Sequence, residues 1–128
     1  MIVSIGIVSI EIRRVREVLR RTPRFRERVF TEAERAYCDS RGEQSAAQHY
    51  AARFAAKEAA FKALRTGWRG PLSWHHVEVG STDDGAPLLF LSDHARDLFD
   101  SLGATHAHLS LSHTSELAVA QVIFESQR

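Results

Sequence analysis

The amino-acid sequence predicts an α+β domain, and three stretches of the chain carry that prediction. The N-terminal run Ile2–Val8 is rich in β-branched residues and has the length of a strand. The stretch from Gln44 to Arg65 is rich in alanine and contains no proline or glycine, which favours one long helix. The C-terminal half holds two pairs of strand-like segments with a helical segment between them. Helices and strands are thus grouped along the chain, unlike the strict alternation of an α/β fold.

The first half of the chain begins with a predicted central strand, because Ile2–Val8 is apolar on both faces. Three shorter helices are expected before the long one. They are Glu11–Arg21, Pro23–Val29 and the segment from Thr31 to Cys38, which opens on a capping box formed by Thr31 and Glu34. Gly67 is expected to end the long helix in a left-handed conformation.

The second half predicts two hairpins separated by a helix. The expected strands are His76–Val79, Pro87–Leu91, His106–Ser112 and Leu117–Phe124. Asp84 and Gly85 supply the turn of the first hairpin. Gly103 ends the helix expected over Asp93–Leu102. No linker, repeat or low-complexity segment interrupts the pattern, so residues 1–128 are expected to form one domain.

The composition is that of an ordinary globular protein, with 44% hydrophobic and 26% charged residues. The net charge of +1 demands no polyanionic partner. Cys38 is the only cysteine, so no internal disulfide forms, and a reducing, cytoplasmic setting is expected. The apolar start lacks the basic region of a signal peptide and is too short to span a bilayer, so no membrane association is expected. The chain also lacks a P-loop, a dinucleotide fingerprint and a nucleophile elbow.

The long helix carries the first candidate for chemistry. Helical spacing places Glu58 beneath Lys62 and on the row of Phe54, so its carboxylate starts on the apolar side of the helix. A carboxylate held there needs a cation, which is either Lys62 or a metal ion. The competing interpretation is an ordinary surface pair four residues apart.

The second candidate is the strand that ends at His113. His108, Ser110 and Ser112 share one face, and hydroxyls beside imidazoles are suited to hold phosphate oxygens. Alternatively, these residues form the solvated face of an edge strand. His106 and His108 also have the spacing of metal ligands, but the sequence offers no third ligand beside them.

Eight arginines opposed by two glutamates between positions 13 and 28 form the third candidate. Such a local excess attracts acidic surfaces or phosphates, and Phe25 lies in its midst as a possible apolar anchor. Nucleic acid is the alternative partner, but stacking platforms are sparse.

Taken in order, these segments resemble the small bacterial holo-acyl-carrier-protein synthases over essentially the whole chain. The matching residues are Ile5-Gly6-Ile7, Glu11-Ile12, Arg28-Val29-Phe30-Thr31, Glu34, the run from Ala52 to Ala59, Lys62-Ala63-Leu64, Thr66-Gly67 and Ser110-Leu111-Ser112-His113. The resemblance implies the 4′-phosphopantetheinyl transferase fold, assembled as a trimer with sites between subunits. It also implies an enzyme that uses magnesium and moves 4′-phosphopantetheine from coenzyme A to a serine of an apo acyl carrier protein.

Carried over by position, the resemblance assigns roles to individual residues. Glu58 is expected to bind magnesium and Lys62 to contact the transferring phosphate, with His113 as a further catalytic residue. Coenzyme A is expected to contact Arg53, Thr66, Gly67, Ser112 and His113. The acidic carrier protein is expected to dock on Arg14, Arg21, Arg24, Phe25 and Arg28. This explains the arginine excess better than nucleic acid does.

Two positions depart from the family pattern. The family has an aspartate, its second magnesium ligand, where this chain has Val8, and an alkyl side chain cannot coordinate a hard cation. Arg65 stands where the family favours glycine, and its cationic side chain is expected to crowd the pantetheine channel or hold a different anion. Ser9 or Glu11 would replace the lost ligand in a weakened transferase. Alternatively, the chain is a paralogue that still docks a carrier protein but acts on or scaffolds its tethered chain.

Overall fold

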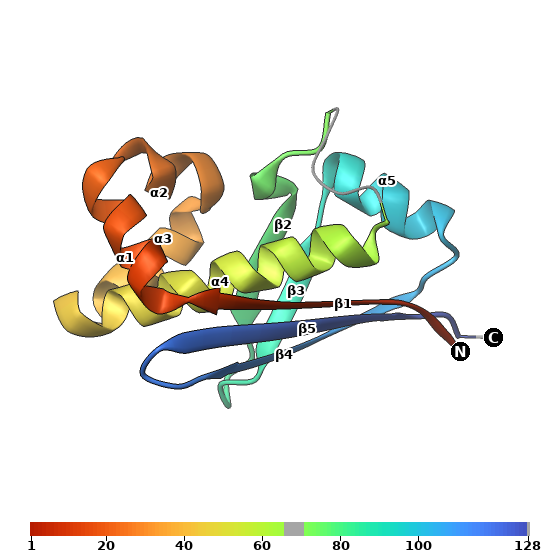
Figure 1. Ribbon diagram of the computed structural model, residues 1–128. Coiled ribbons are helices and arrows are strands. Elements are labelled where there is room, and N and C mark those ends of the chain that lie inside the picture. Colours follow the sequence, from red (N-terminus) through yellow and green to blue (C-terminus); the bar gives the residue numbers. More distant parts are fainter. Residues whose placement is uncertain (66–70, 128) are drawn as a thin grey trace.

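The computed structural model describes residues 1–65 and 71–127 and confirms the α+β class (Figure 1). Its elements follow the expected order with ends shifted by a few residues. They are β1 (Ile2–Glu11), α1 (Ile12–Arg21), α2 (Arg24–Val29), α3 (Glu32–Ser40), α4 (Glu43–Ala63), the 3₁₀ turn η1 (Trp74–His76), β2 (Val77–Ser81), β3 (Pro87–Leu91), α5 (Asp93–Ser101), β4 (His106–His113) and β5 (Leu117–Glu125).

The strands form two antiparallel sheets, one of three strands in the order β1-β5-β4 and one of the two strands β2 and β3. The prediction that β1 is a central strand is therefore wrong, since β5 occupies the centre and β1 an edge. The apolar pattern that suggested a central strand has another cause. One face of β1 packs on α4, and the other leaves Ile5 and Ile7 more than half exposed in the single chain.

Helix α4 lies along the three-stranded sheet, and the β2–β3 hairpin crosses this helix and contacts β4 (Figure 1). The approach of β1 to α4 is very close at Gly6, where an added Cβ would lie 1.9 Å from the carbonyl oxygen of Ala59. The Ser4 hydroxyl donates a hydrogen bond of 2.7 Å to the carbonyl of Ala63. Small residues on both elements thus permit a spacing that larger side chains would prevent.

The end of α4 differs from the prediction, because the helix stops at Ala63, before Gly67. Arg65 adopts the left-handed conformation with φ 68°, which a glycine would adopt without strain. Its guanidinium donates a hydrogen bond of 2.8 Å to the carbonyl of Val3 on the free edge of β1, so it is occupied there. Gly67 lies outside the described residues.

Helices α1, α2 and α3 gather around the N-terminal part of α4, while α5 and both chain ends lie at the opposite end (Figure 1). The capping box at the start of α3 is confirmed, with the Thr31 hydroxyl accepting from the amide of Glu34. The Met1 ammonium donates to the carbonyl of Ser126 at 2.9 Å, which holds the two ends together. Within the described ranges, no helix has the length and apolarity to cross a membrane.

Candidate active site

Glu58 lies at a cavity of about 490 Å³ between β1, α1, α2 and α4. Its walls are mostly apolar, with polar side chains from β1 and α1 on one side. The lining residues are Ser9, Ile10, Glu11, Arg14, Val15, Val18, Phe25, Phe54, Glu58 and Leu117. We call this space the Glu58 cavity. It joins a predicted catalytic residue, Glu58, to two predicted docking residues, Arg14 and Phe25.

The Glu58 carboxyl is half-buried on α4. Burial raises its pKa above the ordinary value, and the positive charge of Lys62 opposes that rise. In the described part of the chain no ion pair joins these two side chains, because the Lys62 ammonium donates to the carbonyl of Ile7 at 3.1 Å. The surface-pair interpretation of Glu58 is therefore not what the structure shows. Glu58 instead lines the Glu58 cavity, while the nearby ammonium of Lys62 bonds to β1.

The residues around Glu58 suit a magnesium ion that takes most of its ligands from substrate and water. Val8 is partly buried against the core beside α4 and offers no oxygen, so a second carboxylate at this position is missing. Ser9 and Glu11 line the same cavity as Glu58 and carry suitable oxygens. No group of three or more acidic, histidine or cysteine ligands occurs among residues 1–65 and 71–127. Magnesium typically needs only one or two protein carboxylates beside phosphate oxygens and waters.

Arg53 and His113 line a second cavity of about 400 Å³, between α3, α4, the β2–β3 hairpin and β4. Arg53 is only 6% exposed, and its Nε atom has no hydrogen-bond partner. Its guanidinium carbon lies 4.2 Å from the centre of the Tyr37 ring, and one of its terminal nitrogens donates weakly to the carbonyl of His49 at 3.5 Å. A buried cation with an unused donor is costly unless an anionic group completes it. We call this space the Arg53 cavity.

Tyr37 and His49 are two residues of the Arg53 cavity that the sequence did not single out. Their rings meet edge to face with centroids 5.5 Å apart. Burial, followed by the charges of Arg53, Arg41 and His113, lowers the pKa of His49 below its ordinary value. His49 precedes Arg53 by one helical turn, which was the available sequence signal. No spacing rule, however, links Tyr37 to them across two helices.

The structure brings together some of the predicted site residues and separates others. Glu58 lies in one cavity and Arg53 with His113 in the other. Ser112 is exposed on β4 and faces the same side of the sheet as His108 and Ser110, as predicted. Thr66 and Gly67 lie outside the described residues. The described residues of a single chain thus divide the predicted site between two cavities, which we call the two half-sites.

The predicted docking residues form a basic surface on α1 and α2. Arg14, Arg21, Arg24 and Arg28 are all exposed. Phe25 is half-buried and packs edge to face on Phe54, with ring centroids 5.5 Å apart. Arg26, which was not assigned to docking, is held by an ion pair with Asp39 and a hydrogen bond of 3.1 Å to the Tyr50 hydroxyl.

The chain matches known proteins over nearly its full length. Residues 4–122 match the model of the 4′-phosphopantetheinyl transferase superfamily. A holo-[acyl-carrier-protein] synthase of Koribacter versatilis is 44% identical over 126 residues, covering 98% of this chain and 99% of the relative. One of Trichlorobacter lovleyi is 47% identical over 127 residues with the same coverage. The crystal structure of the Bacillus anthracis synthase in complex with CoA (3′,5′-ADP) superposes with a TM-score of 0.82 at 39% identity, covering 99% of each chain.

Proposed function

The chain belongs to the 4′-phosphopantetheinyl transferase superfamily, and we propose that it transfers 4′-phosphopantetheine from coenzyme A to a serine of an apo acyl carrier protein. The carrying observation is the Glu58 cavity, in which a half-buried carboxylate shares one space with a docking arginine and Phe25. A carrier bound on the basic surface of α1 and α2 would present its serine at this cavity. Full-length similarity to holo-[acyl-carrier-protein] synthases supports the same reaction.

In the proposed reaction the serine oxygen forms a bond to the phosphorus that carries the pantetheine arm. The diphosphate bond of coenzyme A breaks, 3′,5′-ADP leaves, and the serine proton passes to a base. Such transfers depend mainly on positioning and on neutralising the charge of the phosphates. Lys62 lies near Glu58 with an exposed ammonium that can exchange its bond to Ile7 for a phosphate oxygen. Glu58 is the residue that would hold magnesium, which supplies further charge neutralisation when bound.

The Arg53 cavity suits the nucleotide end of coenzyme A. Its buried guanidinium has an unused donor, and His113 and Tyr37 add a second polar group and an aromatic face. Ser112 stands beside His113 on β4 and adds a hydroxyl. The coenzyme A complex of the Bacillus anthracis synthase supports a nucleotide site in this fold.

The two half-sites belong together in the proposed assembly, a trimer with active sites between subunits. Ile5 and Ile7 of β1 point away from α4, because Ser4 and Gly6, which alternate with them, contact that helix. The same face of the sheet carries Val119 and Ile123 of β5, together with polar side chains of Gln121, Ser110 and Ser112, and we call it the outer sheet face. Its exposed isoleucines, Ile5 and Ile7, are suited to bury against another copy of the chain. The Glu58 cavity of one copy can then complete the Arg53 cavity of the next.

The first test is the intact mass of an apo acyl carrier protein after incubation with this protein, coenzyme A and magnesium. We expect a mass gain equal to one phosphopantetheine group, and no gain when magnesium is chelated. A Val8→Asp variant measured beside it should need less magnesium, because it adds a second carboxylate. Carrier that binds without gaining mass, with wild type and variant alike, would favour the paralogue that docks a carrier but performs another task.

The buried Cys38 is compatible with the cytoplasmic setting proposed for this reaction.

A further inference from the structure

Lys57 forms a buried ion pair with Glu34 that none of the proposed roles uses. The two charged groups are 2.9 Å apart, and both side chains have 0% exposure. The Lys57 ammonium also donates to the backbone carbonyl of Trp74 at 3.0 Å and to that of Val77. All three of its protons are therefore engaged, by one carboxylate and two carbonyls.

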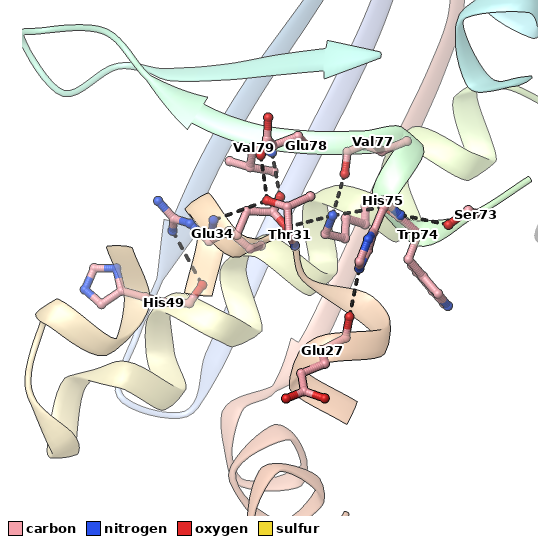
Figure 2. Close-up of polar contacts among 12 residues, drawn as sticks. Glu27, Thr31, Glu34, His49, Ser73, Trp74, His75, Val77, Glu78 and Val79 are labelled. Carbon is pink, nitrogen blue, oxygen red and sulfur yellow. Dashed lines mark hydrogen bonds and ion pairs between the residues drawn. The ribbon is translucent and has the colours of Figure 1, made fainter. Parts of the chain in front are cut away.

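Glu34 is equally well satisfied on its own side of the pair. One carboxylate oxygen accepts from the amide of Thr31 at 2.8 Å and also meets Lys57. The other accepts from the amide of Val79 at 2.7 Å. Figure 2 shows Glu34, Thr31, Val77 and Val79 converging on this point from α3 and the start of β2. We call Lys57, Glu34 and the carbonyls of Trp74 and Val77 the Lys57 clamp. It ties α3 and α4 to the chain segment that enters β2.

The clamp is connected to a wall of the Glu58 cavity through the side chain of Trp74. The Trp74 ring packs on Phe54 with centroids 5.2 Å apart and on Phe61 with centroids 4.9 Å apart. Phe54 lines the Glu58 cavity and in turn contacts Phe25. Lys57 thus holds the backbone of Trp74, whose side chain packs on Phe54, the aromatic residue one turn before Glu58 in the wall of the same cavity.

Lys57 also lies on α4 between the two half-sites. Glu58, the next residue, faces one cavity, and Arg53, one turn earlier on the same row, lines the other. Rotation or sliding of α4 would move both residues at once. An ion pair with no exposed surface resists such movement, because any displacement leaves a buried charge without its partner.

We propose that Lys57 is a positioning residue for the transfer reaction, which holds α4 and the Trp74–Phe54 wall in register so that Glu58 and Arg53 face their ligands. This inference rests on the proposed function of the Glu58 cavity. Lys57 itself touches no substrate, since it is fully buried. Substitution of Lys57 should therefore lower the turnover rate of the folded protein and not only its stability.

The test compares two single variants and one double variant. Lys57→Met removes every bond of the clamp, whereas Glu34→Gln removes the charge of Glu34 and one of its two acceptor oxygens but leaves Lys57 able to bond the Trp74 and Val77 carbonyls. The double variant Glu34→Leu/Lys57→Met removes both charges and replaces them with apolar side chains. Each is made in a Trp68→Phe background, because the sequence holds only two tryptophans and Trp74 then becomes the sole reporter.

We expect kcat per folded molecule to fall about tenfold or more in Lys57→Met and to stay within about threefold in Glu34→Gln. The double variant should regain thermal stability over Lys57→Met, since a buried pair can be replaced by apolar groups. Its kcat should nevertheless stay low, because the carbonyls of Trp74 and Val77 remain unheld. Trp74 emission should shift in both variants that lack Lys57 and not in Glu34→Gln.

Three outcomes would overturn the inference. Equal kcat in Lys57→Met and Glu34→Gln is one, and a double variant that regains kcat together with stability is another. The third is failure of both Lys57 variants to fold at low temperature, which would assign Lys57 to global stability only. An inactive wild type would instead refute the proposed function. The Trp74 emission of the same variants would then still report whether Lys57 holds this wall.

Discussion

Arg65 affects the stability of the fold in two opposite ways, since its backbone conformation is strained and its side chain makes a stabilising hydrogen bond. A left-handed conformation costs a residue with a side chain about 1–2 kcal/mol, and a glycine avoids that cost. The hydrogen bond from its guanidinium to the carbonyl of Val3 stabilises the fold by about 1 kcal/mol. A glycine at this position would avoid the backbone strain, and this left-handed conformation could not be read from the sequence alone.

We predict that Arg65→Gly is about 1 kcal/mol more stable than Arg65→Ala. Both variants lose the bond to Val3, but only alanine keeps the strain of the left-handed conformation. Urea unfolding of the two variants measures the difference. Equal stabilities would show that this turn tolerates a Cβ without cost.

His49 is the residue for which the structure predicts a pH effect. Its folded-state pKa is lowered from 6.5 by burial and by neighbouring cations, whereas in the unfolded chain it titrates near the ordinary value. Below that value the unfolded chain binds a proton that the folded chain excludes. Stability therefore decreases as the pH falls through this window.

We expect wild type to lose more stability than His49→Gln between about pH 8 and about pH 5. The variant keeps a polar side chain of similar size but cannot take up the proton. Denaturant titrations at the two pH values give the comparison. A variant that loses as much as wild type would show that other groups cause the acid sensitivity.

At the scale of the elements, the contact of β1 with α4 determines where the Glu58 cavity forms. Gly6 lies against the backbone of Ala59, and Ser4 bonds the carbonyl of Ala63. This contact sets the separation between the strand that carries Ser9 and the helix that carries Glu58. The backbone of α4 cannot yield to a methyl group in the way that a side chain can.

Gly6→Ala is accordingly predicted to destabilise the protein by about 3 kcal/mol. Gly80→Ala provides the matched control, because its added Cβ meets only the end of the Phe90 ring, at 2.8 Å, and that ring can turn aside. We expect the control to lose about 1 kcal/mol. Thermal unfolding of both variants measures these losses, and a larger effect at Gly80 would contradict the argument.

The sequence predicted the elements themselves well, for reasons that are local. The Thr31 capping box, the alanine-rich helix and the alternation before His113 each depend on neighbouring residues, and each is confirmed. The prediction that β1 is a central strand was wrong, because residues that are apolar on both faces do not show whether a second strand pairs with the edge. The end of α4 was also missed, since an arginine in a left-handed conformation gives no sequence signal.

On the scale of the whole molecule, the site residues divide between two surfaces of one chain. Family resemblance identified Glu58 and Arg53, but spacing along α4 could not show that they serve different cavities. Tyr37 and the Lys57 clamp depend on contacts between distant elements and were not predictable from patterns within one segment. The arrangement is explained if neighbouring copies complete each site, as proposed above.

The proposed assembly predicts the behaviour of Ile7→Glu. Ile7 is 54% exposed in the single chain, so the variant should fold with a stability within about 0.5 kcal/mol of wild type when both are monomeric. A buried charge on the outer sheet face should nevertheless prevent trimer formation and abolish transfer. Leu88→Glu, on the separate β2–β3 sheet, should leave both unchanged.

Sedimentation equilibrium and the mass-gain assay measure the two effects on the same samples. A wild type that sediments as a monomer would refute the proposed assembly. An active monomeric variant would show that one chain completes its own site.

The bonds of Lys62 and Arg65 to the edge of β1 have a consequence for solubility. A free strand edge is a template for pairing with strands of other molecules, and aggregation often begins there. Two carbonyls of this edge, those of Ile7 and Val3, are already taken by long cationic side chains. A lysine proposed to bind phosphate therefore also shields the first strand from foreign strands, so its removal would cost the protein resistance to aggregation as well as activity.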